Sequence, residues 1–89
     1  MKEESGRLAG RIAVVTAAGQ GIGRAVAERL MADGAEVHAS DINAELLATL
    51  DGAATTRLDA TDHGAVSAYF EGFDRVDILV NANRRTFIS

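Results

Sequence analysis

The stretch Thr16-Ala17-Ala18-Gly19-Gln20-Gly21-Ile22-Gly23 decides how this sequence folds. It follows an apolar run, residues 12–15, that is typical of a buried strand, and it precedes residues 24–32, which have helical character. A glycine-rich turn between a strand and a helix presents free backbone N–H groups to a phosphate. Glycine suits such a turn because a side chain would keep a pyrophosphate away from the backbone. The stretch therefore predicts a dinucleotide site.

Predicted strands and helices alternate along the rest of the chain. Strands are predicted at 11–16, 35–40, 54–58 and 76–80, and helices at 21–32, 44–50 and 63–72. Polar residues at 55–57 place the third strand near a sheet edge. Strands that alternate with helices imply right-handed crossovers and a parallel sheet. We expect an α/β fold, a partial doubly wound (Rossmann) sheet of about four strands in the order 3-2-1-4.

Apolar residues at helical spacing indicate which helix faces pack on the sheet. Asn43 is a candidate cap for the second helix, and Thr61 or Asp62 for the third. The third helix is expected to bury the side chains of Val66, Tyr69, Phe70 and Phe73. The apolar positions of the first two helices are Ile22, Val26, Leu30, Met31, Leu46, Leu47 and Leu50.

Length and composition exclude several classes of protein. The 89 residues form at most one small domain, residues 1–89, with an expected core at 8–82 and a loose lead-in at 1–9. The net charge of −4 argues against nucleic-acid binding, and the chain has no cysteine. No apolar run approaches the roughly 18 residues of a membrane span, and the first ten residues are too polar for a secretory signal. We therefore expect a cytoplasmic protein.

Asp41 directly follows the second predicted strand, where a carboxylate can accept hydrogen bonds from the adenosine ribose hydroxyls. The turn is not a P-loop, because Arg24-Ala25 stands where Lys and a hydroxyl residue are required, and Arg24 also breaks the G-x-G-x-x-G pattern. Asp41 would repel a 2′-phosphate, and no arginine follows at 42 or 43 to receive one. We therefore expect NAD rather than NADP as the cofactor.

The sequence resembles the short-chain dehydrogenases/reductases over Leu8–Ala82. Their nucleotide loop is usually T-G-x-x-x-G-I-G, which Thr16, Gly21, Ile22 and Gly23 match, while Ala17 replaces the first glycine. The form T-A-A-x-Q-G-I-G resembles the branch that includes enzymes similar to cytosolic 3-hydroxybutyrate dehydrogenase and sugar-acid dehydrogenases. The resemblance implies NAD-dependent oxidation or reduction of a secondary alcohol, hydroxy acid or sugar acid.

The resemblance also implies roles for individual residues. Gln20, Gly21 and Ile22 line the pyrophosphate, and Asp41 with Ile42 holds the adenosine ribose. Asp59-Ala60 looks like the D-V pair whose aspartate contacts the adenine amino group, although Asp59 is alternatively a turn or cap residue. Asn81-Ala82 looks like the start of the N-x-A-G segment beside the nicotinamide-side ribose, although Asn81 alternatively ties backbone groups together. The full candidate set is Thr16, Gly19, Gln20, Gly21, Ile22, Gly23, Asp41, Ile42, Asp59, Ala60, Asn81 and Ala82.

No catalytic residue is predicted in this chain. The family's chemistry depends on a Tyr-x-x-x-Lys pair and an upstream serine. Here Tyr69 is the only tyrosine, Phe73 stands four residues on, and the only lysine is Lys2. We expect residues 1–89 alone to be inactive as a dehydrogenase. A noncatalytic NAD- or adenosine-binding module, or an inactive remnant that associates with a full-length relative, is the alternative to the NAD-binding part of a dehydrogenase.

Several remaining features receive plainer interpretations. The tail Asn83–Ser89 departs from the family and is a truncation scar, an altered reading frame or a local divergence. His38 and His63 lack a second ligand at metal spacing, so no metal site is expected. Asp74 and Asp77 are interpreted as solvated turn residues. Apolar side chains at 76–80 would lie at an uncovered sheet edge, which predicts self-association.

Overall fold

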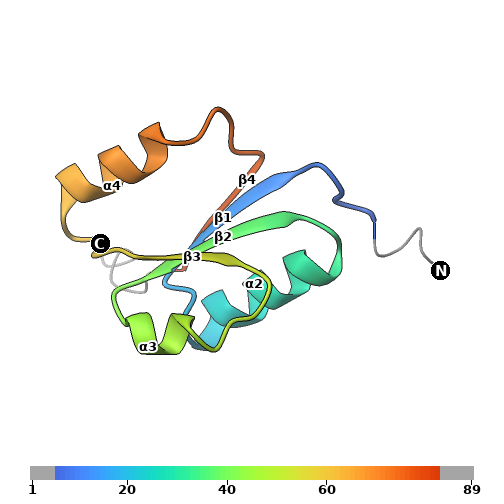
Figure 1. Ribbon diagram of the computed structural model, residues 1–89, viewed down its shortest axis with the longest axis horizontal. Coiled ribbons are helices and arrows are strands. Elements are labelled where there is room, and N and C mark those ends of the chain that lie inside the picture. Colours follow the sequence, from blue (N-terminus) through green and yellow to red (C-terminus); the bar gives the residue numbers. More distant parts are fainter. Residues whose placement is uncertain (1–5, 83–89) are drawn as a thin grey trace, which may run out of the picture.

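A four-stranded parallel sheet forms the centre of the computed structural model, which describes residues 6–82 (Figure 1). The strands are β1 (Ile12–Thr16), β2 (Glu36–Asp41), β3 (Ala54–Arg57) and β4 (Ile78–Asn81), in the order β3-β2-β1-β4. Val14 of β1 pairs with His38 on one side and Leu79 on the other. The predicted α/β fold and strand order are therefore confirmed. Because the strands are parallel, their carboxyl ends all lie on the same side of the sheet.

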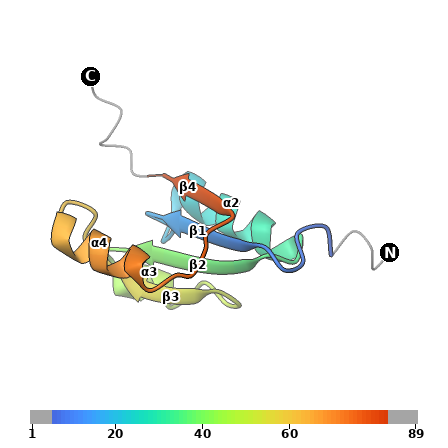
Figure 2. The same ribbon diagram turned by 90° about the horizontal axis from the view of Figure 1, so that it is seen from above.

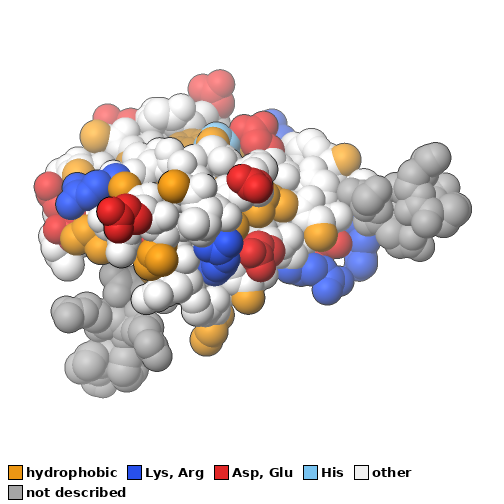
Figure 3. All heavy atoms as spheres, turned by 60° about the horizontal axis from the view of Figure 1, so that its bottom comes forward, with side chains coloured by type: hydrophobic (Ala, Val, Ile, Leu, Met, Phe, Trp, Pro, Cys, Tyr) orange, Lys and Arg blue, Asp and Glu red, His pale blue; other side chains and the backbone are white. Residues whose placement is uncertain are grey.

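Helices cover both faces of this sheet. α2 (Gly21–Ala32) and α3 (Ala44–Leu47) lie below the sheet in Figure 1, and α4 (His63–Glu71) lies above it. Figure 2 shows α4 over the β2–β3 half of the sheet, with β4 at the opposite edge. On the side that carries α2 and α3, acidic and basic side chains are interspersed (Figure 3). None of the helices within residues 6–82 is long and apolar enough to cross a membrane.

Small apolar side chains build the core between the sheet and the α2–α3 layer. Ala13, Val14 and Val15 of β1 have no exposed surface, as expected of a strand with neighbours on both sides. Ala27 is equally buried and lets α2 approach the sheet closely. The core cluster consists of Ala13, Val15, Ala18, Ala27, Ala35, Val37, Ala39, Leu47 and Leu50.

The side chains of α4 and of Phe73 are less buried than the sequence predicts. Val66, Tyr69, Phe70 and Phe73 are only half-buried, and no residue of α4 is fully buried, so the prediction of buried positions here is corrected. The rings of the last three pack edge-on or tilted against one another. The Phe73 ring also packs edge-on against the His38 ring, with 4.8 Å between the ring centroids. Among residues 6–82, α4 is the one helix on this face, so solvent reaches its aromatic side chains.

Element boundaries differ from the predictions where local hydrogen bonds change. α3 ends at Leu47 rather than Leu50, because the N–H groups of Thr49 and Leu50 donate to carbonyls three residues back. Leu50 nevertheless stays buried. Asp41 and Asn81, expected just beyond their strands, are the last residues of β2 and β4.

The two ends of the chain are described only in part. Leu8 donates its N–H to the Asp33 carbonyl at 2.7 Å and packs against the core, so the expectation of a loose lead-in is wrong for this residue. Residues 1–5 and the divergent tail Asn83–Ser89 lie outside the described residues.

Candidate dinucleotide-binding site

The turn between β1 and α2 has a backbone shape that glycine adopts easily. Ala17 and Gly21 have φ of 55° and 66°, in the left-handed region. A Cβ built on Gly21 would meet no atom within 4 Å, whereas one on Gly23 would lie 2.3 Å from the Ala17 carbonyl oxygen. Gly21 therefore leaves open space in front of the helix, and Gly23 lets the helix pack on the turn.

Asp41 ties this turn to the end of β2. Gly19 donates its N–H to Asp41 Oδ2 at 2.8 Å, and Asn43 donates its N–H to Oδ1 at 2.9 Å. A Cβ on Gly19 would lie 2.9 Å from the same Oδ2, so only glycine allows this approach. Each carboxylate oxygen accepts one of these bonds and retains a second lone pair. The side chain can therefore support the turn and still accept hydrogen bonds from a ligand.

The N-terminus of α2 is open to an anion. Gln20 is the N-cap residue, and neither its side chain nor an acidic residue of the first turn caps the helix. The first N–H groups of a helix have no partner within the helix, and they carry its partial positive charge. Gln20, Gly21 and Ile22 are exposed here. Ile22, an apolar position at helical spacing, is 78% exposed and lies outside the core.

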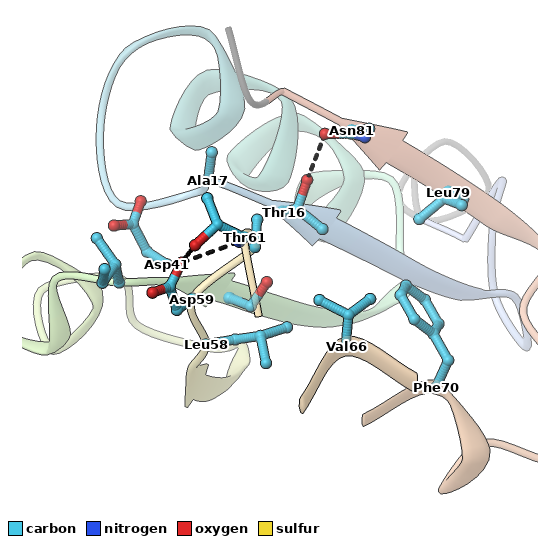
Figure 4. A pocket seen from close by; sticks show the side chains of 13 residues that line it. Thr16, Ala17, Asp41, Leu58, Asp59, Thr61, Val66, Phe70, Leu79 and Asn81 are labelled. Carbon is cyan, nitrogen blue, oxygen red and sulfur yellow. Dashed lines mark hydrogen bonds between the residues drawn. The ribbon is translucent and has the colours of Figure 1, made fainter. Parts of the chain in front are cut away.

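A cleft of about 550 Å³ opens beside the turn, at the ends of the strands (Figure 4). Its walls come from all four strand ends and from α4. Six predicted site residues line it, namely Thr16, Asp41, Ile42, Asp59, Ala60 and Asn81. The other six, Gly19, Gln20, Gly21, Ile22, Gly23 and Ala82, belong to the turn, to the start of α2 and to the residue after β4.

Asp59 forms a turn after β3. Its Oδ1 accepts hydrogen bonds from the Thr61 hydroxyl at 2.7 Å and the Thr61 N–H at 2.9 Å. These two bonds hold the pKa of the Asp59 carboxyl below its usual range. No hydrogen bond to Oδ2 is formed within residues 6–82, so that oxygen can accept one from another group. The cap of α4 is Asp62, which accepts from the Ala65 N–H at 3.1 Å.

Asn81 joins the ends of β1 and β4. Its Oδ1 accepts a hydrogen bond from the Thr16 hydroxyl at 3.0 Å (Figure 4). This bond joins two side chains, whereas the alternative considered for Asn81 concerned backbone groups; both side chains line the cleft. Ala82 follows directly, and its Cβ would lie 3.1 Å from a Cβ on Gly23.

Sequence reasoning missed part of the cleft wall. Ser40 is only 2% exposed, yet it lines the cleft beside Asp41. Its position before the last residue of a parallel strand is a signal that could have identified it. The sequence predicts Val66 and Phe70 to be buried, and their partial exposure follows from facing the cleft. The other lining residues outside the predicted set are Ala17, Leu58, Thr61 and Leu79.

A family model described as short chain dehydrogenase matches residues 11–83. The match includes the glycine turn, Asp41, Asp59 and Asn81, and so most of the site. This chain belongs to the short chain dehydrogenase family. Members of the family use a nicotinamide dinucleotide, NAD or NADP, and the dinucleotide is therefore the ligand class to test against the geometry.

Two curated relatives have dehydrogenase names. "Dehydrogenase/reductase SDR family member 6" of Danio rerio is 46% identical over 79 residues, covering 85% of this chain and 32% of the relative. "2-dehydro-3-deoxy-L-rhamnonate dehydrogenase (NAD(+))" of Sphingomonas is 38% identical over 84 residues, covering 85% of this chain and 34% of the relative. The chain thus spans about a third of the length of these two curated relatives.

A solved structure with the same fold has a different activity in its name. It is described as ribose-5-phosphate isomerase from Brucella melitensis, with a TM-score of 0.82 and 38% identity over 88% of this chain and 33% of that chain. A shared fold does not determine the reaction, so this likeness supports the architecture and not an activity.

The residues of the chain fit the dinucleotide that the family uses. The open space at Gly21 and the uncapped α2 N-terminus suit a pyrophosphate. Asp41 supplies acceptor oxygens beside the turn, as a ribose would need, and the cleft has a mixed polar and apolar wall.

Proposed function

We propose that this chain is the NAD-binding part of a dehydrogenase that acts on a secondary alcohol, a hydroxy acid or a sugar acid. One observation carries the proposal: the 2.8 Å hydrogen bond between Gly19 N–H and Asp41 Oδ2. It brings a phosphate-binding turn and a ribose-binding carboxylate into one site. When bound, NAD supplies the hydride acceptor for alcohol oxidation.

Each part of the site has a role in this proposal. The α2 N-terminus at Gly21 and Ile22 binds the pyrophosphate, and Asp41 accepts hydrogen bonds from the adenosine ribose hydroxyls. Asp59 accepts a hydrogen bond from the adenine amino group through Oδ2. Asn81 lies beside the nicotinamide-side ribose. The residues that shape the turn and cleft around these groups are Thr16, Gly19, Gln20, Gly23, Ile42, Ala60 and Ala82.

The relatives support the choice of NAD and of the T-A-A-x-Q-G-I-G branch, since one of them is named as an NAD(+) enzyme on a sugar acid. A noncatalytic NAD-binding module is the second candidate. It is favoured by the lack of a Tyr-x-x-x-Lys pair in the 89 residues. Both candidates predict that residues 1–89 alone form no NADH from hydroxy acids, because the pair is absent from them. The coding sequence downstream of Ser89 separates the two: a Tyr-x-x-x-Lys pair there would favour the dehydrogenase, and its absence would favour the module.

The choice of NAD is tested at Asp41. Titration of the 89-residue chain should give tighter binding of NAD than of NADP, because the carboxylate repels a 2′-phosphate. Asp41→Asn keeps an acceptor oxygen for the Gly19 N–H but removes the charge, so the preference should shrink. Asp51→Asn, at an exposed position outside the cleft, is the charge-matched control and should leave the preference unchanged. Equal or tighter NADP binding by the unmodified chain would refute the choice.

A further inference from the structure

The side chain of Arg24 connects the glycine turn to the end of α3. Its guanidinium donates to Thr49 Oγ1 at 2.7 Å, to the Thr49 carbonyl at 3.0 Å and to the Gly19 carbonyl at 3.4 Å. Its Nε donates to Glu28, one turn along α2, at 3.1 Å. These bonds use four of the five N–H donors of the side chain. The group is therefore committed to contacts within the protein.

The Gly19 backbone is held at both ends by side chains from different elements. Its N–H donates to Asp41 of β2, and its carbonyl accepts from Arg24 of α2. A Cβ on Gly19 would lie 2.9 Å from the Leu46 Cβ, so the turn also presses against α3. Residues 20–22, which contact the pyrophosphate in the proposed function, follow directly. Fixing Gly19 therefore fixes where these N–H groups point.

Thr49 is a firm anchor for the arginine. Its hydroxyl donates to the Leu46 carbonyl at 2.8 Å, which fixes the acceptor that faces Arg24. Leu46 is the same residue that borders Gly19. The carbonyl of Thr49, two residues past the end of α3, accepts a second hydrogen bond from the same guanidinium. Arg24 thus contacts both the glycine turn, at Gly19, and the segment after α3, at Thr49, and the turn itself lies against Leu46 of α3.

We propose that Arg24 is a positioning residue for dinucleotide binding, and that it acts through the Gly19 carbonyl and Thr49 rather than by contacting the phosphates. The inference rests on the proposed function, because the turn it positions is the pyrophosphate site. Arg24 pre-organises the turn, so the ligand does not have to order it on binding.

The test compares ligands with and without a pyrophosphate. Kd values for NAD, ADP-ribose and adenosine are measured by NMR titration on four variants of the 89-residue chain. Arg24→Met removes every donor and keeps the side-chain length, and Arg24→Lys restores the charge without the planar fork. Thr49→Val removes the anchoring hydroxyl without changing charge. Arg29→Met is the control, because Arg29 lies on the same helix and pairs only with Asp33 at 3.3 Å in the part of the chain that is described.

Arg24→Met should raise the Kd of NAD and of ADP-ribose about tenfold, the size expected for lost charge-assisted hydrogen bonds. The Kd of adenosine should change by less than about twofold. Thr49→Val should raise the Kd of the same two ligands by a smaller factor. Arg24→Lys should bind them more tightly than Arg24→Met does, and Arg29→Met should bind all three ligands like the unmodified chain. In the ligand-free chain, Arg24→Met should speed amide hydrogen exchange at Gly19, whose N–H is hydrogen-bonded to Asp41.

Equal losses for adenosine and NAD would overturn the inference, since Arg24 would then serve only the stability of the fold. Unchanged NAD binding in Arg24→Met would also overturn it. A loss of NAD binding in Arg24→Met with none in Thr49→Val, and with no faster exchange at Gly19, would overturn the inference in favour of direct phosphate contact. If the unmodified chain binds none of the three ligands, the proposed function fails and the inference fails with it.

Discussion

At the scale of single residues, Ala17 is the place where the turn deviates from a relaxed backbone. Its φ of 55° is unfavourable for a residue with a Cβ, at a cost of about 1 kcal/mol. The sequence shows that alanine replaces a glycine here, but the dihedral that makes the replacement costly depends on the folded turn. Gly21, at φ 66° with open space around it, could be identified from its spacing alone.

Ala17→Gly should therefore stabilise the chain by roughly 0.5 kcal/mol, because relief of the strain exceeds the added entropy of the unfolded chain. The same substitution at Ala25, an exposed position inside α2, should destabilise the chain by about 1 kcal/mol. Chemical denaturation of both variants measures these two changes. A lower denaturation midpoint for Ala17→Gly than for the unmodified chain would mean that Ala17 is not strained.

At the scale of elements, Asp77 joins the starts of β1 and β4, although the sequence suggested a solvated turn residue. Its Oδ2 accepts the Ile12 N–H at 2.8 Å, and its own N–H donates to the Ile12 carbonyl at 2.8 Å. Arg75 also contacts the carboxylate, at 3.1 Å. The Ile12 N–H and then Arg75 hold the pKa of the Asp77 carboxyl below its usual range.

This shift predicts how stability depends on pH. The folded chain binds a proton at Asp77 less readily than the unfolded chain, so the stabilisation is present above the unfolded pKa of about 4 and is lost as pH falls through the lowered value. The gap in urea midpoint between the unmodified chain and Asp77→Asn should be larger at pH 6 than at pH 3. For Asp74→Asn, at a nearby exposed position, the difference in urea midpoint from the unmodified chain should be the same at pH 6 and pH 3. A gap that is constant with pH would contradict the assignment.

The strands, the glycine turn and the strand order could be predicted because each depends on local apolar pattern and known crossover geometry. β1 is buried because Ala13, Val14 and Val15 are apolar on both faces. The contacts of Asp77, Arg24 and Ser40 could not be predicted, because each joins residues that are distant in sequence or faces a wall built by several elements. The half-burial of α4 depends on what else covers that face, which periodicity does not report.

At the scale of the whole molecule, the β4 edge and the α4 face remain partly uncovered within residues 6–82. Leu79 of β4 is 57% exposed, and the Tyr69 hydroxyl is buried without a hydrogen-bond partner in the described part of the chain. The chain also spans about a third of the relatives it matches. An apolar strand at a sheet edge is a template for pairing with another chain.

We therefore propose that the 89-residue chain self-associates through β4. Light scattering should show an average mass that rises with concentration, and Leu79→Thr should reduce the rise by making the edge less apolar. Ile42→Thr removes a comparable side chain, 53% exposed, that follows β2, and β1 separates β2 from β4; this variant should leave the mass unchanged. A monomer at every concentration would contradict the proposal.

The central claim is that the turn at Gly21 binds the pyrophosphate of NAD, and a calorimetric titration of NAD into two glycine variants tests it most directly. Gly21 and Gly10 both have positive φ, 66° and 85°, and at both a Cβ would meet nothing within 4 Å. Aspartate tolerates this conformation, so both variants should fold. Gly21→Asp, with a carboxylate in front of the α2 N-terminus, should lose NAD binding, while Gly10→Asp at the far end of β1 should bind NAD like the unmodified chain. Equal NAD affinity in Gly21→Asp and Gly10→Asp would contradict the account.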